Sequence, residues 1–265
     1  MEEIKKLREA TGAGMVECKK ALDEAAGDLD KAIEILRKKG IAKAAKRSDR
    51  QANEGVIKMK INTEQKKAYI LELNSETDFV ARNETFQDFA ERLIEIASSN
   101  NIDNLDDLHN FSMEKGSVLE NLENLSGTIG EKIVVSKLNS ISGESLALYS
   151  HMNGKIGVII ALDQSDKEDL ALEIAMHVAA SNPKYLTRDE IPSEEIEKEK
   201  DIYKEQLLKE GKPEEIIDKI IMGKIVKYYS EVCLVDQEFI KDDKLKISDI
   251  LKDTKILSFI RYSLQ

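Results

Sequence analysis

A carboxylate and an aromatic ring stand next to each other at Asp78 and Phe79, inside the stretch 72–82. An apolar, strand-like run at 68–71 precedes them, and an amphipathic run with helical spacing follows at 86–97. Two regular elements therefore hold a short connection with this pair at its tip. Such a tip suits either a side chain that enters a partner protein, or a loop folded onto its own core in which Asp78 caps a helix.

Groups that catalyse bond chemistry are sparse. The three histidines (His109, His151, His177) and the two cysteines (Cys18, Cys233) show no metal-ligand spacing. His177 lies in an apolar helical run, which favours a packing role, and His151 lies in a predicted turn. The chain also lacks a Walker phosphate loop, a dinucleotide-binding glycine pattern and a Gly-x-Ser-x-Gly elbow. We therefore expect no catalytic residue, metal, cofactor or direct nucleotide binding, and hence no enzyme.

Composition narrows the class of partner. The 265 residues carry a net charge of −11, so extensive nucleic-acid binding is not expected. One segment departs from this background, because 37–50 holds seven basic residues and one acid. It is interpreted as a solvated helical linker, with contact to RNA or to an acidic partner as the alternative. No signal peptide or membrane-length apolar run is visible, so we expect a cytoplasmic protein.

Helical spacing dominates the first 40 residues. Three short helices are predicted, broken at 11–14 and near Gly27, with Asp28 as the N-cap of the third and Gly40 as its C-terminal stop. Together they form a compact three-helix module.

Two copies of a β-β-α order follow. The first has strands at 55–61 and 68–73 and a helix after Asn83; the second has strands at 146–149 and 156–162 and a helix at 170–181. This repetition indicates two related subdomains. Between them, 105–123 is predicted to be helical and 133–138 to be a strand.

A charged segment interrupts the second copy. Ser193 is predicted to cap a helix with a narrow apolar stripe, and a turn at 211–213 leads to a second helix that reaches Tyr229. The prediction is thus an α+β fold with a three-helix module, a core of two related β-β-α subdomains with antiparallel sheets, and a protruding antiparallel coiled-coil hairpin. The predicted domains are 1–54, 55–140, 141–192 with 230–265, and the inserted hairpin 193–229.

Two motifs carry a family resemblance. Thr11-Gly12-Ala13-Gly14-Met15 with Cys18-Lys19-Lys20-Ala21-Leu22 resembles the N-terminal signature of bacterial elongation factor Ts, and 72–82 resembles its second signature. The segment 177–181 and the Gly211-Lys212-Pro213 turn are also similar to that family. The resemblance implies a UBA-like N-terminal domain and a guanine-nucleotide exchange factor for elongation factor Tu. Such a factor disturbs the Mg²⁺ and phosphate site of its partner, so that GDP leaves during translation elongation.

The resemblance also implies contact residues. Asp78 and Phe79 would form the intruding tip, with Thr77 and Val80 beside them. The secondary contacts that it implies are Met15, Val16, Lys19, Ile129, Gly130, His151 and His177.

Three questions stay open at this stage. Phe79, Met15 and Val16 could instead be core residues of their own units. An RNA-binding accessory factor or a hairpin-bearing scaffold without exchange activity is the alternative function. Many members of the family have a further C-terminal segment, and this sequence ends at Gln265, so a contact from such a segment is in doubt.

Overall fold

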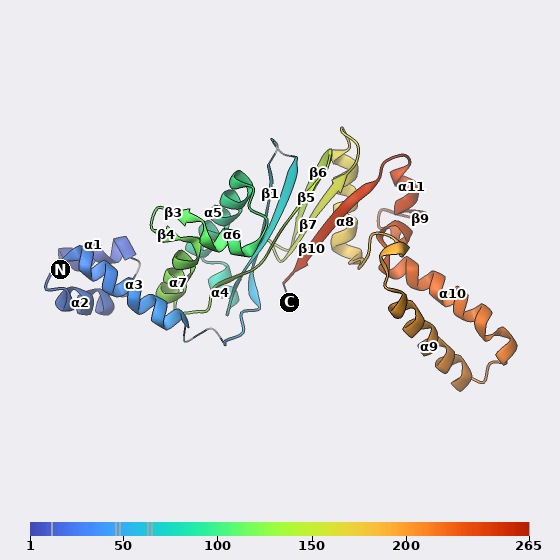
Figure 1. Cartoon of the computed structure of the whole chain (residues 1–265), viewed down its shortest axis with the longest axis horizontal. Coiled ribbons are helices and arrows are strands. Elements are labelled where there is room, and N and C mark those ends of the chain that lie inside the picture. The colour runs from blue at the N-terminus through green and yellow to red at the C-terminus, as the bar shows by residue number, and fades with distance from the viewer. Residues whose placement is uncertain (12, 46, 48, 63, 65, 265) are drawn as a thin grey trace.

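The computed structural model describes residues 1–11, 13–45, 47, 49–62, 64 and 66–264, without the side chains of 41–45. The chain is elongated: helices α1–α3 lie at one end, two sheets form the middle, and helices α9 and α10 project at the other end (Figure 1). The fold is a mixed α+β fold with N-terminal helices and several small antiparallel sheets, as predicted in outline.

The N-terminal unit consists of α1 (Glu2–Thr11), α2 (Met15–Glu24) and α3 (Leu29–Ala45). Their small core centres on Leu7 and Cys18, and the Asp28 carboxylate accepts a hydrogen bond from Lys31 N, which confirms it as the cap of α3. The predicted stop at Gly40 is wrong, since α3 continues to Ala45. The predicted break at Gly12 and the basic residue Lys46 lie outside the described residues.

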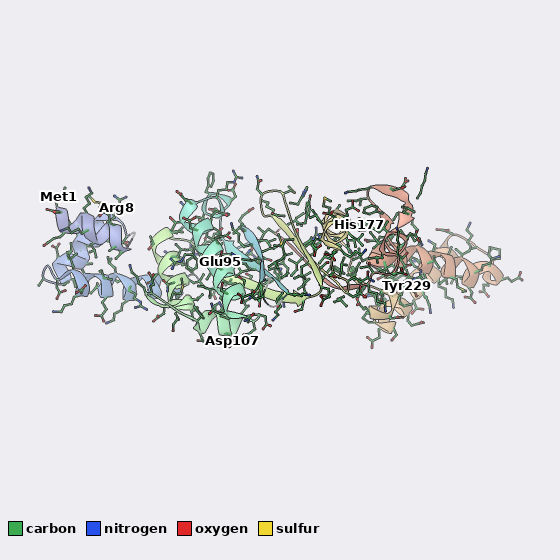
Figure 2. All side chains as sticks on the ribbon, turned by 90° about the horizontal axis from the view of Figure 1, so that it is seen from above. Met1, Arg8, Glu95, Asp107, His177 and Tyr229 are labelled. Carbon is green, nitrogen blue, oxygen red and sulfur yellow. The ribbon has the colours of Figure 1, made fainter. Side chains whose placement is uncertain are left out.

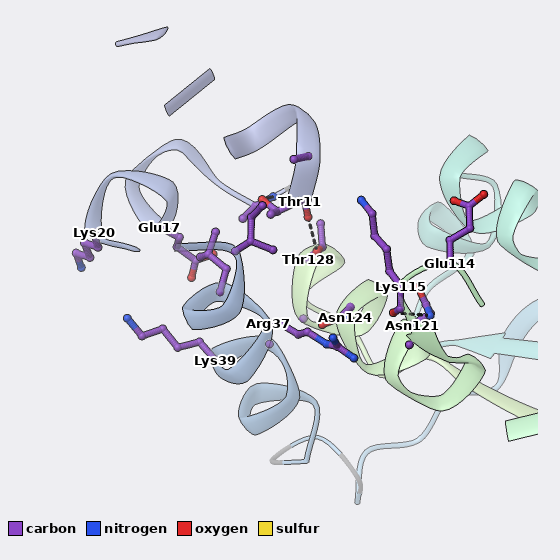
Figure 3. A pocket seen from close by; sticks show the side chains of 17 residues that line it. Thr11, Glu17, Lys20, Arg37, Lys39, Glu114, Lys115, Asn121, Asn124 and Thr128 are labelled. Atoms are coloured by element: carbon purple, nitrogen blue, oxygen red, sulfur yellow. Dashed lines mark hydrogen bonds between the residues drawn. The ribbon is translucent and has the colours of Figure 1, made fainter. Parts of the chain in front are cut away.

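Gly40 instead marks the place where α3 crosses α7 (Val118–Ile129). A Cβ atom on Gly127 would lie 2.7 Å from the Cα atom of Gly40, so the two backbones touch where both residues lack side chains. Arg37 pairs with Glu120 of α7 at 2.6 Å beside this crossing. A cleft of about 840 Å³ opens next to it, and Thr128 Oγ1 donates to Thr11 O across that cleft (Figure 3). The crossing therefore docks the N-terminal unit on the core.

The first sheet has the order β1-β2-β5, all antiparallel: β1 (Glu54–Asn62), β2 (Lys67–Ser75) and β5 (Val134–Ser142). Alternate residues of β2, among them Tyr69, Leu71 and Leu73, pack against α5 (Glu84–Asn100). These strands and the Asn83 cap of α5 confirm the predicted elements.

The predicted helix over 105–123 is partly wrong. The chain forms α6 (Leu105–Asn110), the short strands β3 (Ser112–Met113) and β4 (Gly116–Ser117), and then α7. A capping box starts α7, because Ser117 accepts from Glu120 N while the Glu120 carboxylate accepts from Ser117 N. Gly116, at φ +93°, is the first residue of β4 and directly follows the turn at 114–115.

The second sheet has the order β10-β7-β6: β6 (Ser145–His151), β7 (Ile156–Leu162) and β10 (Ile256–Ser263). Helix α8 (Glu168–Ser181) covers its outer face. The inner faces of the two sheets meet at a shared cluster that includes Ile57, Ile70 and Ile159. The middle of the molecule is therefore layered as helix, sheet, sheet, helix.

Helices α9 (Ser193–Lys209) and α10 (Glu214–Val232) lie side by side and share an apolar cluster of Leu207, Ile217, Ile221 and Ile225 (Figure 1). The cap predicted at Ser193 is wrong: Pro192 takes that position, without a side-chain hydrogen bond.

At the base of the two helices, the hydroxyls of Tyr185 and Tyr228 both donate to Glu195. The 3₁₀ helices η1 (Arg188–Glu190) and η2 (Leu234–Asp236), the strands β8 (Glu238–Phe239) and β9 (Asp242–Lys246), and the helix α11 (Ile247–Leu251) complete the chain. Among the described helices, none combines the length and apolar character that a membrane crossing requires.

Candidate functional site

The connection after β2, which we call the tip loop (residues 75–83), contains a one-turn helix, α4 (Asp78–Ala81). Thr77 is the N-cap of α4, and its hydroxyl oxygen accepts from Val80 N at 3.4 Å. Asn83 caps α5 immediately afterwards by accepting from Thr85 N at 3.0 Å. Two caps within seven residues fix the path of the tip loop.

Phe79 projects from this loop with 82% of its surface exposed. Its neighbours face the opposite way, since Ala81 is buried and Val80 packs against the core of the first sheet. The core alternative for Phe79 is therefore excluded. An exposed aromatic ring on a rigid support is a candidate contact with another protein.

The alternative in which Asp78 is the N-cap of a helix is excluded. Thr77 caps the helix, and Asp78 is its first residue, where its carboxylate pairs with the Arg82 guanidinium at 2.8 Å. An acid in the first turn is favoured by the helix dipole, so Asp78 still stabilises α4 while remaining at the surface of the tip.

Glu131 is a residue of this site that sequence reasoning missed. Its carboxylate accepts two hydrogen bonds from Thr77, from N at 3.0 Å and from Oγ1 at 2.7 Å. Ile129 and Gly130 precede it, and Gly130 ends α7 at φ +93°. The structure thus brings the segment 129–131 beside the tip loop. No local sequence signal joins residues 54 positions apart.

Three of the secondary residues lie on α2, in the N-terminal unit at the end of the molecule opposite α9 and α10 (Figure 1). Met15 is 47% and Val16 67% exposed, and Lys19 is exposed too, while Cys18 faces the core of the unit. The alternative that Met15 and Val16 pack inside the N-terminal unit is therefore excluded.

His151 is exposed, as predicted, but it is the last residue of β6, opposite Ile156, and the turn itself spans 152–155. Its Nδ1 atom lies 3.2 Å from the hydroxyl of Tyr149. Strand pairing thus extends one residue further than the turn pattern indicated.

His177, labelled in Figure 2, is fully buried on α8, and its ring lies against the segment 237–240. Ile240 N donates to Nδ1, so Nε2 carries the proton of the neutral ring and donates to Gln237 Oε1 at 2.9 Å. Burial lowers the pKa of His177, although its bond to Gln237 opposes the shift. His177 is therefore a packing residue, and its side chain is not accessible to a partner in the free chain.

We expect the free energy of unfolding to fall as the pH drops below 6.5, the ordinary histidine pKa. The unfolded chain then binds a proton at His177, whereas the native chain with its depressed pKa does not, at a cost of at most about 1.4 kcal/mol one pH unit lower. Urea unfolding at about pH 7.5 and about pH 5.5 measures this difference. His177→Gln should reduce it, and an unchanged difference would contradict the assignment. Burial lowers the pKa of His109 as well, so part of the dependence should remain.

Two further observations bear on bond chemistry. Among the described residues, no cluster of three or more His, Cys, Asp or Glu side chains could hold a metal ion. Burial raises the pKa of Cys233 to about 11, with Asp236 adding to the effect, so this residue is a protonated thiol at neutral pH and a poor nucleophile.

Comparisons with known proteins agree with this geometry. The family described as "Elongation factor TS" matches residues 76–265. A protein named elongation factor Ts from Chlorobaculum parvum is 45% identical, over 99% of this chain and 97% of its own. Its namesakes from Deinococcus deserti (44% identical, 100% and 99% covered) and Nitratiruptor sp. (47% identical, 99% and 92% covered) are equally similar. The motifs around the tip loop, the fold that holds it and these matches place the chain in the elongation factor Ts family.

Proposed function

We propose that this chain acts on elongation factor Tu through its tip loop. As a member of the elongation factor Ts family it is a nucleotide exchange factor for elongation factor Tu and not an enzyme. Phe79 enters the GTPase near its Mg²⁺ and phosphate site, and Asp78 adds a polar contact beside it. GDP then leaves, and GTP displaces the factor. The observation that supports this proposal is the 82% exposure of Phe79 on a loop fixed by two helix caps.

The binding free energies form a closed cycle: if the factor weakens the binding of GDP to the GTPase, GDP weakens the binding of the factor by the same free energy. Burying Phe79 contributes about 1.5–3 kcal/mol. A ~1,000-fold loosening of GDP requires about 4 kcal/mol. One side chain therefore accounts for roughly half of such an effect, and the remainder has to come from other contacts.

The exposed secondary residues supply those contacts in our proposal. Met15, Val16 and Lys19 meet the GTPase domain from α2, and Ile129 with Gly130 adds a contact beside the tip. His151 reaches the distal β-domain of the partner. Thr77 and Val80 are both partly buried, so in our proposal they support Phe79 from the side of the tip loop that faces the core. His177 joins α8 to the segment 237–240 through its two ring nitrogens and does not touch the partner.

The finer architecture fits the same proposal. The apolar seam between α9 and α10 supports an antiparallel coiled coil spanning 193–229. Each sheet with its outer helix repeats one β-β-α order, which supports two related subdomains at 55–140 and at 141–192 with 230–265, after an N-terminal domain 1–54. A factor of translation works in the cytoplasm.

Release of a fluorescent GDP analogue from purified elongation factor Tu tests the function. Substoichiometric amounts of this protein should accelerate release over many turnovers, because GTP or free GDP displaces the factor after each exchange. The matched control is the same protein after heat denaturation. Release at the spontaneous rate in both samples would refute the proposed function.

A further inference from the structure

Phe79 is held in position from across the chain by a residue that follows α7. We propose that Glu131 is a positioning residue for nucleotide exchange: its carboxylate fixes Thr77, so that Phe79 already points into solvent before the partner arrives. This inference rests on the proposed function of the tip loop and adds a residue that need not touch the partner. We call the two hydrogen bonds between Glu131 and Thr77 the clamp.

Both oxygens of the Glu131 carboxylate are used in the clamp. Oε2 accepts from Thr77 N at 3.0 Å, and Oε1 accepts from Thr77 Oγ1 at 2.7 Å. Bonds to an ionised acceptor are about twice as strong as bonds between neutral groups, and two parallel bonds also fix direction. The carboxylate therefore fixes the orientation of both the backbone N–H and the side-chain hydroxyl of Thr77.

The hydroxyl of Thr77 transmits this orientation to the helix that bears Phe79. Its hydrogen is donated to Glu131, so its oxygen is left to accept from Val80 N. That acceptance is the N-cap of α4, and α4 carries Phe79 in its first turn. Without the clamp the hydroxyl is free to rotate away, and α4 loses the one cap that its length of four residues allows.

A second pair of bonds holds the opposite side of the same junction. Glu76 Oε1 accepts from Lys132 N at 2.6 Å, and the Arg50 guanidinium pairs with that carboxylate at 3.1 Å. Burial would raise the pKa of Glu76, but the Lys132 N–H and Arg50 outweigh it and lower the pKa, so the group stays ionised. Consecutive residues on each segment are thus joined in two places, Glu76 to Lys132 and Thr77 to Glu131.

The segment that carries Glu131 is itself fixed. Ser126 Oγ donates to Glu131 O at 2.6 Å, and Arg47 donates to Ser126 O at 3.0 Å. Ser126 is buried at the C-terminal end of α7. The clamp therefore connects the tip loop to a segment that is itself anchored to the packed helix α7.

The clamp preorganises the tip loop for binding, so that the loop does not have to become ordered when the partner arrives. An exposed phenylalanine on an unconstrained loop gains free energy by folding onto any apolar surface within its reach. Fixing one residue's backbone costs about 1–2 kcal/mol, and in a loose loop this cost falls on the binding step. With the clamp, this entropy cost is already incurred when the chain folds. More of the free energy of the Phe79 contact is then available to weaken GDP binding.

The test compares Glu131→Gln with the wild-type chain in the GDP-release assay over a range of factor concentrations. Glutamine keeps the shape but removes the charge and one of the two acceptors, so the second-order rate should fall about tenfold. The matched control is Glu91→Gln on α5, outside the tip loop, which removes a carboxylate that pairs with Lys58 of β1. It should leave the rate unchanged.

A double-mutant cycle with Phe79→Ala separates positioning from a general structural role. If Glu131 acts through Phe79, Glu131→Gln should have almost no further effect once Phe79 is alanine. Amide exchange at Val80 and Ala81 should also become faster in Glu131→Gln. Equal fold-losses with and without Phe79, or unchanged amide exchange, would overturn the proposal for Glu131 while leaving the proposed function intact. An unchanged rate in Phe79→Ala alone would instead overturn the role of the tip loop.

Discussion

Replacing Phe79 with alanine is expected to slow factor-dependent GDP release about 10- to 100-fold, the rate equivalent of the free energy gained by burying one phenylalanine. Thermal unfolding should not change, because the side chain is 82% exposed and surface substitutions shift stability by only about 0.5 kcal/mol. Stopped-flow release of a fluorescent GDP analogue measures the first quantity, and calorimetry measures the second. The combination identifies a side chain that serves the complex and not the fold.

The control for Phe79 is another exposed apolar residue of the same chain. Leu257 lies on β10 with 51% of its surface exposed, so Leu257→Ala removes exposed apolar area from a different element. Its release rate should equal that of the wild type. If Phe79→Ala and Leu257→Ala behave alike, the contact that loosens GDP does not come from the tip loop.

The elements around the tip were predictable because their signals are local. Alternating apolar residues at 55–61 indicated β1, and the apolar run at 68–71 indicated β2. The spacing from Phe86 to Ala97, with Asn83 before it, indicated α5. Each of these depends on residues at most a few positions apart. At α4 the local signal was ambiguous, because an aspartate beside a phenylalanine could either cap a helix or lie at an exposed tip, and the structure shows Thr77 as the cap.

Features that depend on distant segments were not predictable. Gly40 looks like a helix stop, yet α3 continues through it, since the absence of a side chain serves the crossing with Gly127. Glu131 belongs to an acidic chain in which one more glutamate carries no information, and only the fold brings its carboxylate to Thr77. The exposure of Phe79 likewise follows from how α4 is oriented, which no pattern of single residues encodes.

The crossing of α3 and α7 gives the second large effect. Gly127→Leu should separate the N-terminal unit from the core, because the new Cβ would lie 2.7 Å from the Gly40 backbone, which cannot yield as a side chain would. Leucine is a better helix former than glycine by about 0.8–1 kcal/mol, so α7 itself should persist. Overpacking of this kind costs about 1–3 kcal/mol, enough to release a unit docked through one helix and a few polar contacts.

Small-angle scattering should then report a larger radius of gyration for Gly127→Leu than for the wild type. The concentration of factor that gives half-maximal GDP release should rise about tenfold, since the contacts proposed for Met15, Val16 and Lys19 would no longer be held in register with the tip. The maximal rate should stay near that of the wild type, because Phe79 and the clamp are untouched.

Gly223→Leu is the matched control: Gly223 lies within α10, and a Cβ there meets no atom within 4 Å. Identical scattering and half-maximal concentrations for both variants would show that the glycine contact does not dock the N-terminal unit. A fall in the maximal rate of Gly127→Leu would instead show that this unit takes part in loosening GDP and not only in binding.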